Sequence, residues 1–332
     1  MALAGTILGT EKKSSIIISN STDVFEKGCF EIKSNFFEPR LVSWATFSPP
    51  KQLFIVSPTK EGTYPVVLFF HGFLLENKFY EDLLHHISSH GLILVAPQLY
   101  ELIPPSGPEE IESAAEVINW LEEGLQPLIN DLVNNNNKVV ADLTTVALAG
   151  HSRGGKAAFA LALGKSEVKC NLKFSVLVGV DPVEGSSMRN RTEPHILTYV
   201  PRSLDLCIPV AVIGTGLGSE RRKPYMPACA PDGLNHAEFF NECKPPCAYF
   251  VAKDFGHMDM LVDRPGGIDG AIANCMCKNG TSPRDLMRRS VGGILVAFLR
   301  AYVGGDHKDL AAIVGDPTLA PTTLDPVNFV PA

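Results

Sequence analysis

The chain has 332 residues, a hydrophobic fraction of 45% and a formal net charge of -7. A chain of this composition can bury a large core, and α/β folds commonly run past about 200 residues as one domain. The negative charge argues against nucleic acid or an anionic membrane surface as the main partner, and no apolar run is long enough to span a bilayer. We therefore expect no transmembrane segment and at most a peripheral membrane contact.

Short apolar stretches interrupted by Pro and Gly dominate residues 1–60 and predict antiparallel edge strands entering a sheet. Residues 66–70 are then continuously apolar, as a strand covered on both faces requires. Apolar side chains at helical spacing predict a helix over residues 80–87, stopped by Gly91. Another buried strand is predicted at residues 92–96.

A Pro-rich turn leads to a helix that opens with Glu109 and Glu110, acidic residues that are favourable at a helix N-terminus. The last predicted helix carries an apolar stripe from Val291 to Tyr302. Strands alternating with helices imply an α/β fold, with a mostly parallel central sheet and helices on both faces. Further strands are predicted at residues 146–149, 174–180, 209–213 and 248–252.

We expect one catalytic domain over residues 49–306, because no internal repeat or linker interrupts it. Residues 1–48 are expected to be partly disordered or to form edge strands, and residues 307–332 to form a C-terminal tail. The N-terminal segment lacks the basic and apolar pattern of a secretory signal, and its acidic residues are untypical of a transit peptide.

The sharpest local signal is the G-x-S-x-G motif at residues 150–154, with Ser152 at its centre. A nucleophilic serine on a tight turn from strand to helix needs glycines beside it, because larger side chains would collide there. The motif lies between a predicted apolar strand and an Ala-rich helix over residues 156–163, which is the context expected for the nucleophile elbow of the α/β-hydrolase fold. Ser152 is therefore the predicted nucleophile.

The acid and the base of such an enzyme follow the serine along the chain. Asp181 comes directly after the predicted strand 174–180, whereas the next strand offers no carboxylate close to its end. His257 follows the last strand and is preceded by Gly256, which allows the chain to bend towards the serine. We therefore predict Asp181 as the orienting acid and His257 as the base, with Asp254 and Asp259 as competing acids.

Acyl transfer also requires hydrogen-bond donors for the negative charge that develops on the carbonyl oxygen. One donor is expected to be the backbone N–H of Arg153, and the other the backbone N–H of Phe73, with Leu74 as the alternative. The apolar residues Leu74 and Leu75, with Met258 beside the base, are predicted to contact substrate. Serine chemistry of this kind needs neither a metal nor an organic cofactor.

The cysteines do not form a convincing zinc site, although Cys243 and Cys247, like Cys275 and Cys277, are close in sequence. Structural thiols, or one or two disulfides, are the better interpretation. The loop over residues 223–243 is rich in apolar and aromatic side chains and could either cover the site or belong to the core.

The sequence resembles the plant chlorophyllases of the α/β-hydrolase superfamily from about residue 49 to residue 306. Among the matching stretches are GHSRGGK at residues 150–156 and AKDFGHMDML at residues 252–261, and it is the combination of stretches that is specific. Other similar stretches are YPVVLFFHGFLL at residues 64–75, SHGLILVAPQLY at 89–100, GVDPV at 179–183 and MRRSVGGILVAFLRAY at 287–302.

The resemblance implies an enzyme of chlorophyll breakdown that cleaves the phytyl ester of chlorophyll to chlorophyllide and phytol. It places the catalytic serine, aspartate and histidine of the family on Ser152, Asp181 and His257. It also implies a chloroplast location, with the cytosol or other plant membranes as the alternative. The magnesium of chlorophyll is expected to be part of the substrate and not a cofactor of the protein.

Two other functions are compatible with the same residues. A carboxylesterase or lipase acting on other lipid esters would use the same three side chains, so substrate preference must separate it from a chlorophyllase. A non-catalytic protein of the hydrolase fold that binds a hydrophobic ligand would bind its ligand without turnover.

Overall fold

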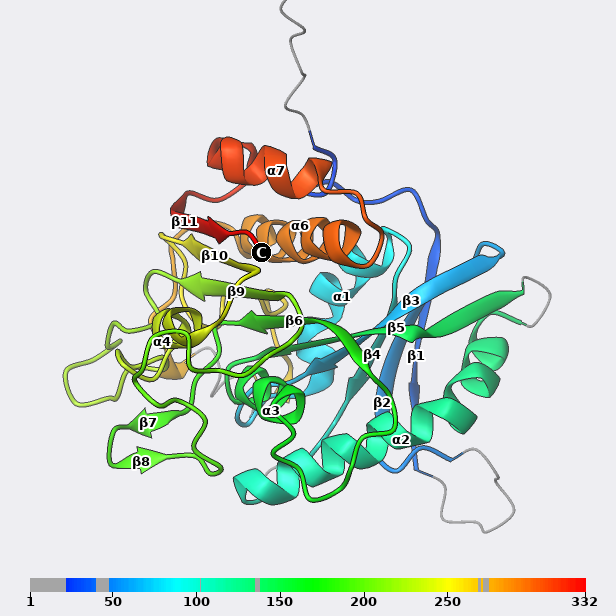
Figure 1. The fold of residues 1–332 in the computed structure, drawn as a ribbon, viewed down its shortest axis with the longest axis horizontal. Helices are drawn as coiled ribbons and strands as arrows, with labels where there is room; N and C mark the ends of the chain where they lie inside the picture. The colour runs from blue at the N-terminus through cyan, green and yellow to red at the C-terminus, as the bar shows by residue number, and fades with distance from the viewer. Residues whose placement is uncertain (1–21, 40–47, 102, 135–137, 268–269, 271–274) are drawn as a thin grey trace, which may run out of the picture.

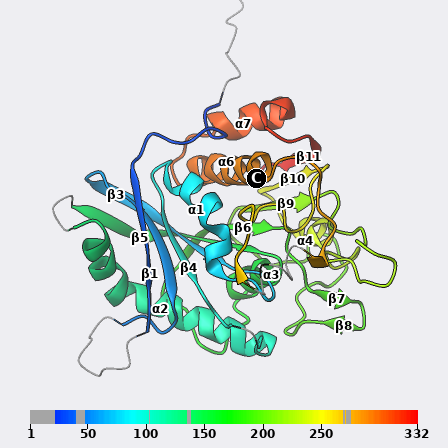
Figure 2. The same cartoon turned by 180° about the vertical axis from the view of Figure 1, so that it is seen from behind.

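The computed structural model describes residues 22–39, 48–101, 103–134, 138–267, 270 and 275–332. Its centre is a sheet with the strand order β1-β2-β4-β3-β5-β6-β9-β10-β11, covered by helices on both faces (Figures 1 and 2). Strands β4, β3, β5, β6, β9 and β10 are parallel to one another. Strand β2 pairs antiparallel with β4 and with β1 at one edge, and β11 pairs antiparallel with β10 at the other. This arrangement confirms the predicted α/β class, including the antiparallel strands at the N-terminal edge.

The strands of this sheet are β1 (Ile32–Phe37), β2 (Leu53–Pro58), β3 (Gly62–Phe70), β4 (Ile93–Pro97), β5 (Val139–His151), β6 (Phe174–Val180), β9 (Val210–Thr215), β10 (Cys247–Ala252) and β11 (Leu324–Val330). A separate hairpin is formed by β7 (Gly185–Ser187) and β8 (Asn190–Arg191). The helices are η1 (Asn77–Tyr80), α1 (Glu81–Ser88), α2 (Gly107–Leu132), α3 (Arg153–Ala162), α4 (His236–Glu242), α6 (Arg284–Tyr302), α7 (Lys308–Gly315) and η2 (Pro317–Leu319).

The two faces of the sheet pack into two separate hydrophobic cores. Successive strand residues point to opposite faces, so Phe54 of β2 lies in the core under α1, α6 and α7, whereas Ile55 lies in the core under α2 and α3. The same alternation continues in β3 and β5. A strand with a core on each side must be apolar at every position, which explains the continuous apolar runs in the sequence.

Helix α2 begins with a reciprocal cap. The Ser106 hydroxyl accepts a hydrogen bond from the N–H of Glu109, and the Glu109 carboxylate accepts one from the N–H of Ser106. Glu110, by contrast, is buried and forms an ion pair with Arg153. Both acidic residues therefore lie in the first turn of the helix, as predicted, and the carboxylate of Glu110 is bound in addition by a partner distant in the chain.

The sheet continues into both terminal segments. Strand β1 pairs with β2, and β11 pairs with β10 through partners such as Cys247 and Val330. The described parts of residues 1–48 and 307–332 thus contribute strands to the same sheet as the rest of the chain, while residues 1–21 and 40–47 lie outside the described residues. The boundaries at residues 49 and 306 stay predictions. In the described part of the chain, no helix has the length and apolar character needed to cross a bilayer.

Candidate active site

Ser152 lies in the tight turn between β5 and α3, with φ 57° and ψ -122°. This left-handed conformation is costly for a residue with a side chain and is typical of functional turns. A Cβ atom at Gly150 would lie 2.4 Å from the carbonyl oxygen of Gly154, and one at Gly154 would lie 2.4 Å from that of Phe70. The two glycines of the motif are therefore required by close backbone contacts, as predicted from the sequence.

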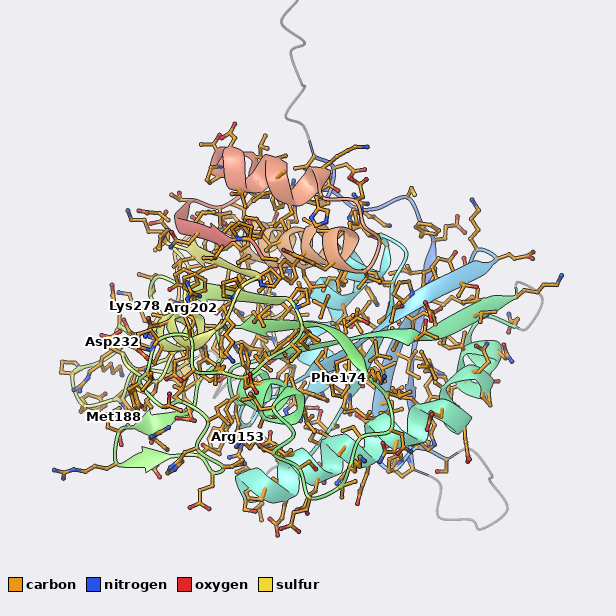
Figure 3. The ribbon with its side chains drawn as sticks, in the orientation of Figure 1. Arg153, Phe174, Met188, Arg202, Asp232 and Lys278 are labelled. Carbon is orange, nitrogen blue, oxygen red and sulfur yellow. A yellow bond between two sulfur atoms is a disulfide. The ribbon has the colours of Figure 1, made fainter. Side chains whose placement is uncertain are left out.

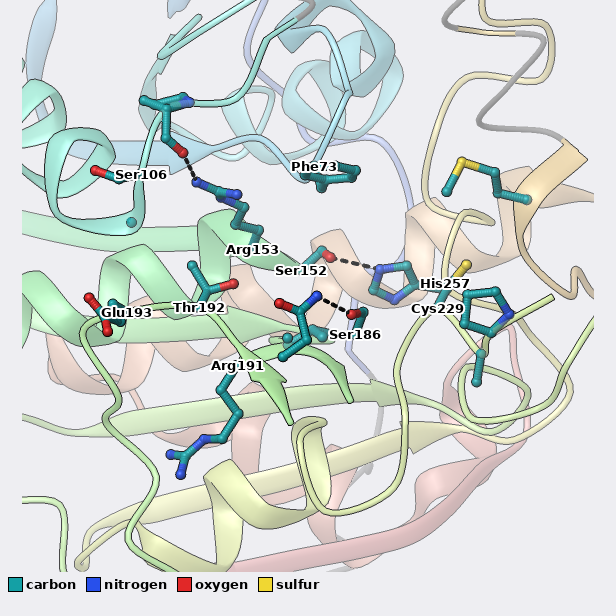
Figure 4. A pocket seen from close by; sticks show the side chains of 18 of the residues that line it. Phe73, Ser106, Ser152, Arg153, Ser186, Arg191, Thr192, Glu193, Cys229 and His257 are labelled. Atoms are coloured by element: carbon teal, nitrogen blue, oxygen red, sulfur yellow. Dashed lines mark hydrogen bonds between the residues drawn. The ribbon is translucent and has the colours of Figure 1, made fainter. Parts of the chain in front are cut away.

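Three side chains from distant parts of the chain form one hydrogen-bonded series. The Ser152 hydroxyl lies 2.8 Å from Nε2 of His257 (Figure 4). Nδ1 of His257 lies 2.6 Å from Oδ2 of Asp181. All three residues are buried. With the histidine protonated on Nδ1, the serine donates to Nε2 and Nδ1–H donates to the carboxylate, an arrangement that can activate a serine hydroxyl as a nucleophile.

Asp181 follows β6 directly and is fixed from the end of β9 as well. Thr215 donates a hydrogen bond from its hydroxyl to Oδ2 of Asp181 at 2.6 Å. Burial alone would raise the pKa of Asp181, but the hydrogen bond and charge of His257, the nearby His236 and the Thr215 hydroxyl lower it to about 2. The carboxylate is therefore ionised throughout the neutral range. Thr215 and His236 were not identified from the sequence.

The loop that carries His257 is held by a second buried carboxylate. Oδ2 of Asp259 accepts hydrogen bonds from the N–H groups of Gly256 and Gly280, both at 2.7 Å. Asp254 is exposed, so neither of the competing acids bonds to the imidazole of His257. Gly256 has no left-handed backbone; a Cβ there would lie 1.9 Å from the carbonyl oxygen of Lys278. Close packing, and not a special bend, requires this glycine.

The loop after β3 brings the predicted oxyanion donors close to the elbow. In the described part of the chain, the N–H groups of Phe73 and Arg153 form no hydrogen bond, so both could donate to a substrate oxygen. His71 orients this loop: its Nε2 accepts from the N–H of Leu99 at 3.0 Å, and its Nδ1 donates to the carbonyl oxygen of Gly72 at 2.9 Å. Burial lowers the pKa of His71 to about 4, which keeps it neutral.

Ser152 and His257 open onto a cavity of about 550 Å³. Figure 4 shows Phe73 and Ser186 on different sides of the serine. The volume is within the range of small-molecule sites, which are commonly apolar with a few polar groups. Apolar lining residues include Phe73, Val183, Met226, Met258 and Met276. Polar lining residues include Ser106, Ser186, Asn190 and Thr192.

The three predicted substrate contacts lie in different environments. Met258 lines the cavity, whereas Leu75 is buried in the hydrophobic core on the α1 side of the sheet. Leu74 is half-buried and is not among the described residues that line the cavity. The prediction for Leu75 is therefore corrected, because its apolar side chain packs inside the protein; substrate contact by Met258 stays a prediction.

Two arginines that line the cavity form ion pairs with buried carboxylates. The guanidinium of Arg153 pairs with Glu110 and lies over the rings of Phe73 and Tyr100, at 5.9 and 5.5 Å from their centroids. On the other side, Arg191 pairs with the buried Glu184. Neither pair was identified from the sequence: Glu110 and Arg153 are 43 residues apart in the chain, and Glu184 and Arg191 belong to no motif.

Lys156 lies between these two ion pairs and is buried. Its ammonium group donates to the carbonyl oxygen of Glu193, a cavity-lining residue, at 2.8 Å. Burial lowers the pKa of Lys156 to about 8, against the opposing effect of Glu110 and Glu184. This lysine therefore holds the backbone of a cavity-lining residue in place, and it remains mostly charged at neutral pH.

A disulfide connects two segments beside the cavity. Cys229 lines the cavity and is bonded to Cys277, with their Cα atoms 5.6 Å apart. In the loop at residues 223–243, Met226 lines the cavity, whereas Phe239 is buried in the core. Among the described residues, no group of three His, Cys, Asp or Glu side chains is placed to hold a metal ion.

Comparison with known proteins covers nearly the whole chain. The family model described as chlorophyllase matches residues 20–331. Chlorophyllase-1 of Arabidopsis thaliana is 53% identical over 280 residues, which cover 84% of this chain and 84% of that protein. Chlorophyllase-2 of Arabidopsis thaliana is 51% identical, with 82% of this chain and 83% of that protein covered. The protein named "Chlorophyllase-1, chloroplastic" of Citrus unshiu is 44% identical, with 99% and 94% covered.

Proposed function

Because the chain belongs to the chlorophyllase family, we propose that it hydrolyses the phytyl ester of chlorophyll through Ser152, releasing chlorophyllide and phytol. The observation that carries the mechanism is the hydrogen-bonded series from Ser152 through His257 to Asp181, which opens onto a cavity. The proposed reaction needs no protein-bound metal or organic cofactor, and the magnesium of chlorophyll enters as part of the substrate.

In the first half of the proposed reaction, the Ser152 oxygen attacks the ester carbonyl carbon while its proton passes to Nε2 of His257. The negative charge on the carbonyl oxygen is stabilised by the N–H groups of Phe73 and Arg153. The ester C–O bond then breaks, and the imidazolium of His257 gives its proton to the departing phytol oxygen. The chlorophyllide acyl group remains on Ser152 as an ester.

In the second half, water replaces the alcohol. His257 takes a proton from the water as the water oxygen attacks the acyl carbon, and then returns a proton to the Ser152 oxygen as that bond breaks. Asp181 keeps its negative charge throughout and stabilises the imidazolium form of His257. Chlorophyllide leaves as a carboxylic acid, and the serine is regenerated.

We also propose that the rim of the cavity rests on a membrane surface. Three exposed apolar residues lie within two residues of lining residues along the chain: Ile103 before Pro105, Met188 between Ser186 and Asn190, and Tyr225 before Met226. Met188 lies on the β7–β8 hairpin at the periphery of the molecule (Figure 3). Exposed apolar side chains around a site mark contact with a membrane or a partner. The chloroplast is the proposed location, supported by the names of the citrus relatives, and its membranes are the proposed surface.

A substrate comparison tests this function against its closest alternative. Purified protein is given chlorophyll a, a triacylglycerol and a p-nitrophenyl ester, and kcat/KM is measured for each. We expect the highest value for chlorophyll a. Hydrolysis of the simple esters with chlorophyll a left intact would replace the proposal by a carboxylesterase or lipase. Binding of the pigment without any turnover would indicate a non-catalytic ligand-binding protein.

A further inference from the structure

His151, the residue before the nucleophile, contacts the base directly although it is not part of the proposed mechanism. It is buried at the end of β5, and its ring centroid lies 4.5 Å from that of His257. Its Nε2 lies 2.9 Å from the carbonyl oxygen of His257. A carbonyl oxygen can only accept, so Nε2 of His151 must carry a proton.

The other ring nitrogen of His151 faces a tyrosine. Nδ1 lies 2.7 Å from the Tyr80 hydroxyl, and that hydroxyl oxygen accepts a hydrogen bond from the N–H of Gly72 at 3.0 Å. The Tyr80 hydroxyl is therefore free to donate its proton to Nδ1, which requires His151 to be neutral. Burial, together with the neighbouring His257, lowers the pKa of His151 well below its ordinary value, in agreement with this assignment.

The hydrogen bonds form one directional series: Gly72 N–H to Tyr80, Tyr80 O–H to His151, and His151 N–H to the carbonyl of His257. One end of the series holds the residue before Phe73, an expected oxyanion donor, and the other holds the backbone of the base. We propose that Tyr80 and His151 are positioning residues that hold the oxyanion loop and the His257 loop in register with Ser152. This inference rests on the proposed function of Ser152 and His257.

Two physical arguments favour a functional role over simple packing. Buried polar groups cost free energy unless every one of them finds a partner, so an apolar pair would be the simpler way to fill this space. In addition, a neutral His151 places no second positive charge beside the imidazolium that forms on His257 during the reaction. Small displacements of reacting groups, on the order of 1 Å, can lower a rate by about 100-fold.

Three variants separate hydrogen bonding from packing. His151→Leu fills the space with an apolar side chain and removes both hydrogen bonds. His151→Gln supplies one acceptor and one donor at the end of a side chain of similar reach. Tyr80→Phe removes only the hydroxyl, so it tests the series even where His151→Leu fails to fold. His86→Leu and Tyr64→Phe are matched controls, because each removes one hydrogen bond to a backbone carbonyl away from the cavity.

Values of kcat and KM are measured with a p-nitrophenyl ester and with chlorophyll a, per active site titrated with a fluorophosphonate. We expect kcat to fall by about 10- to 100-fold in His151→Leu and less in Tyr80→Phe, with KM little changed. His151→Gln should recover most of the lost kcat, and both controls should match the wild type.

An unchanged kcat in His151→Leu and Tyr80→Phe would overturn the inference, and so would a loss in His151→Gln as large as that in His151→Leu. Ser152→Ala, assayed alongside, keeps this result separate from the proposed function. Activity that disappears in Ser152→Ala but stays at the wild-type level in His151→Leu and Tyr80→Phe removes only the positioning role. Activity that persists in Ser152→Ala removes the proposed nucleophile and, with it, the inference.

Discussion

Asp181 remains ionised although its side chain has no contact with solvent. Four groups compensate for the missing water: His257, Thr215, the backbone N–H of Thr215 and the nearby His236. A carboxylate held in this way fixes the tautomer of His257 and stabilises its charged form. The sequence predicts Asp181 from its place after a strand, but the residues that keep it ionised come from elements that fold onto it.

Replacement of Asp181 by Asn should lower kcat by about 10³- to 10⁴-fold, because the amide cannot stabilise the imidazolium of His257. KM for a p-nitrophenyl ester should change little, since Asp181 does not line the cavity. Steady-state kinetics of Asp181→Asn and of Asp254→Asn, which alters an exposed carboxylate in the loop that carries His257, checks this expectation. A similar loss in both variants would contradict the assignment.

The same carboxylate makes a pH-dependent contribution to stability. Its pKa is about 2 in the folded protein against an ordinary value of 3.8, so the contribution is complete above about pH 4 and is lost as the pH falls towards 2. Its size is about 2 kcal/mol. The difference in free energy of unfolding between wild type and Asp181→Asn, measured in urea, should therefore shrink over this interval. A difference independent of pH would be inconsistent with the lowered pKa.

At the scale of elements, the buried strands were the easiest part of the fold to predict. Each must be apolar on both faces, so β3, β4, β6 and β9 stand out as continuous apolar runs. Strand β11 was missed because it lies at the sheet edge, is largely exposed or half-buried, and contains Pro326. An edge strand of this kind is recognised by its pairing with β10, which no local pattern reveals.

The disulfide between Cys229 and Cys277 should stabilise the protein by about 2–4 kcal/mol, because it closes a loop with a sequence separation of 48. The double variant Cys229→Ser/Cys277→Ser should therefore have a lower Tm. It should also have a higher KM, since Cys229 lines the cavity. Cys207→Ser, which changes an exposed free cysteine, is the control. Equal Tm and KM values in wild type, the double variant and Cys207→Ser would show that the disulfide contributes neither to stability nor to the shape of the cavity.

At the scale of the whole molecule, the net charge hides an uneven surface. The chain carries a formal charge of -7, yet Arg221, Arg222 and Lys223 lie together on the exposed loop that leads to Tyr225. Basic residues beside exposed apolar ones favour binding at an anionic lipid surface. The net charge of the whole molecule therefore argues against an anionic surface. The basic and exposed apolar residues of this loop, however, directly precede Met226, which lines the cavity.

The triple variant Ile103→Ser/Met188→Ser/Tyr225→Ser should bind vesicles of phosphatidylcholine and phosphatidylglycerol at least about tenfold more weakly than wild type. Co-sedimentation measures the partitioning. Val140→Ser is a matched control, because Val140 is 44% exposed but lies at the opposite end of β5 from Ser152. Equal binding by wild type and the triple variant would exclude this rim as the membrane contact.

The most direct test of the central claim is chlorophyllide release from chlorophyll a by purified wild type, Ser152→Ala and Ser186→Ala. Both serines line the cavity, but only Ser152 is bonded to His257. The proposal predicts release by wild type and by Ser186→Ala, and a loss of several orders of magnitude in Ser152→Ala. Release that survives in Ser152→Ala, or a wild type that leaves chlorophyll a intact, would contradict it.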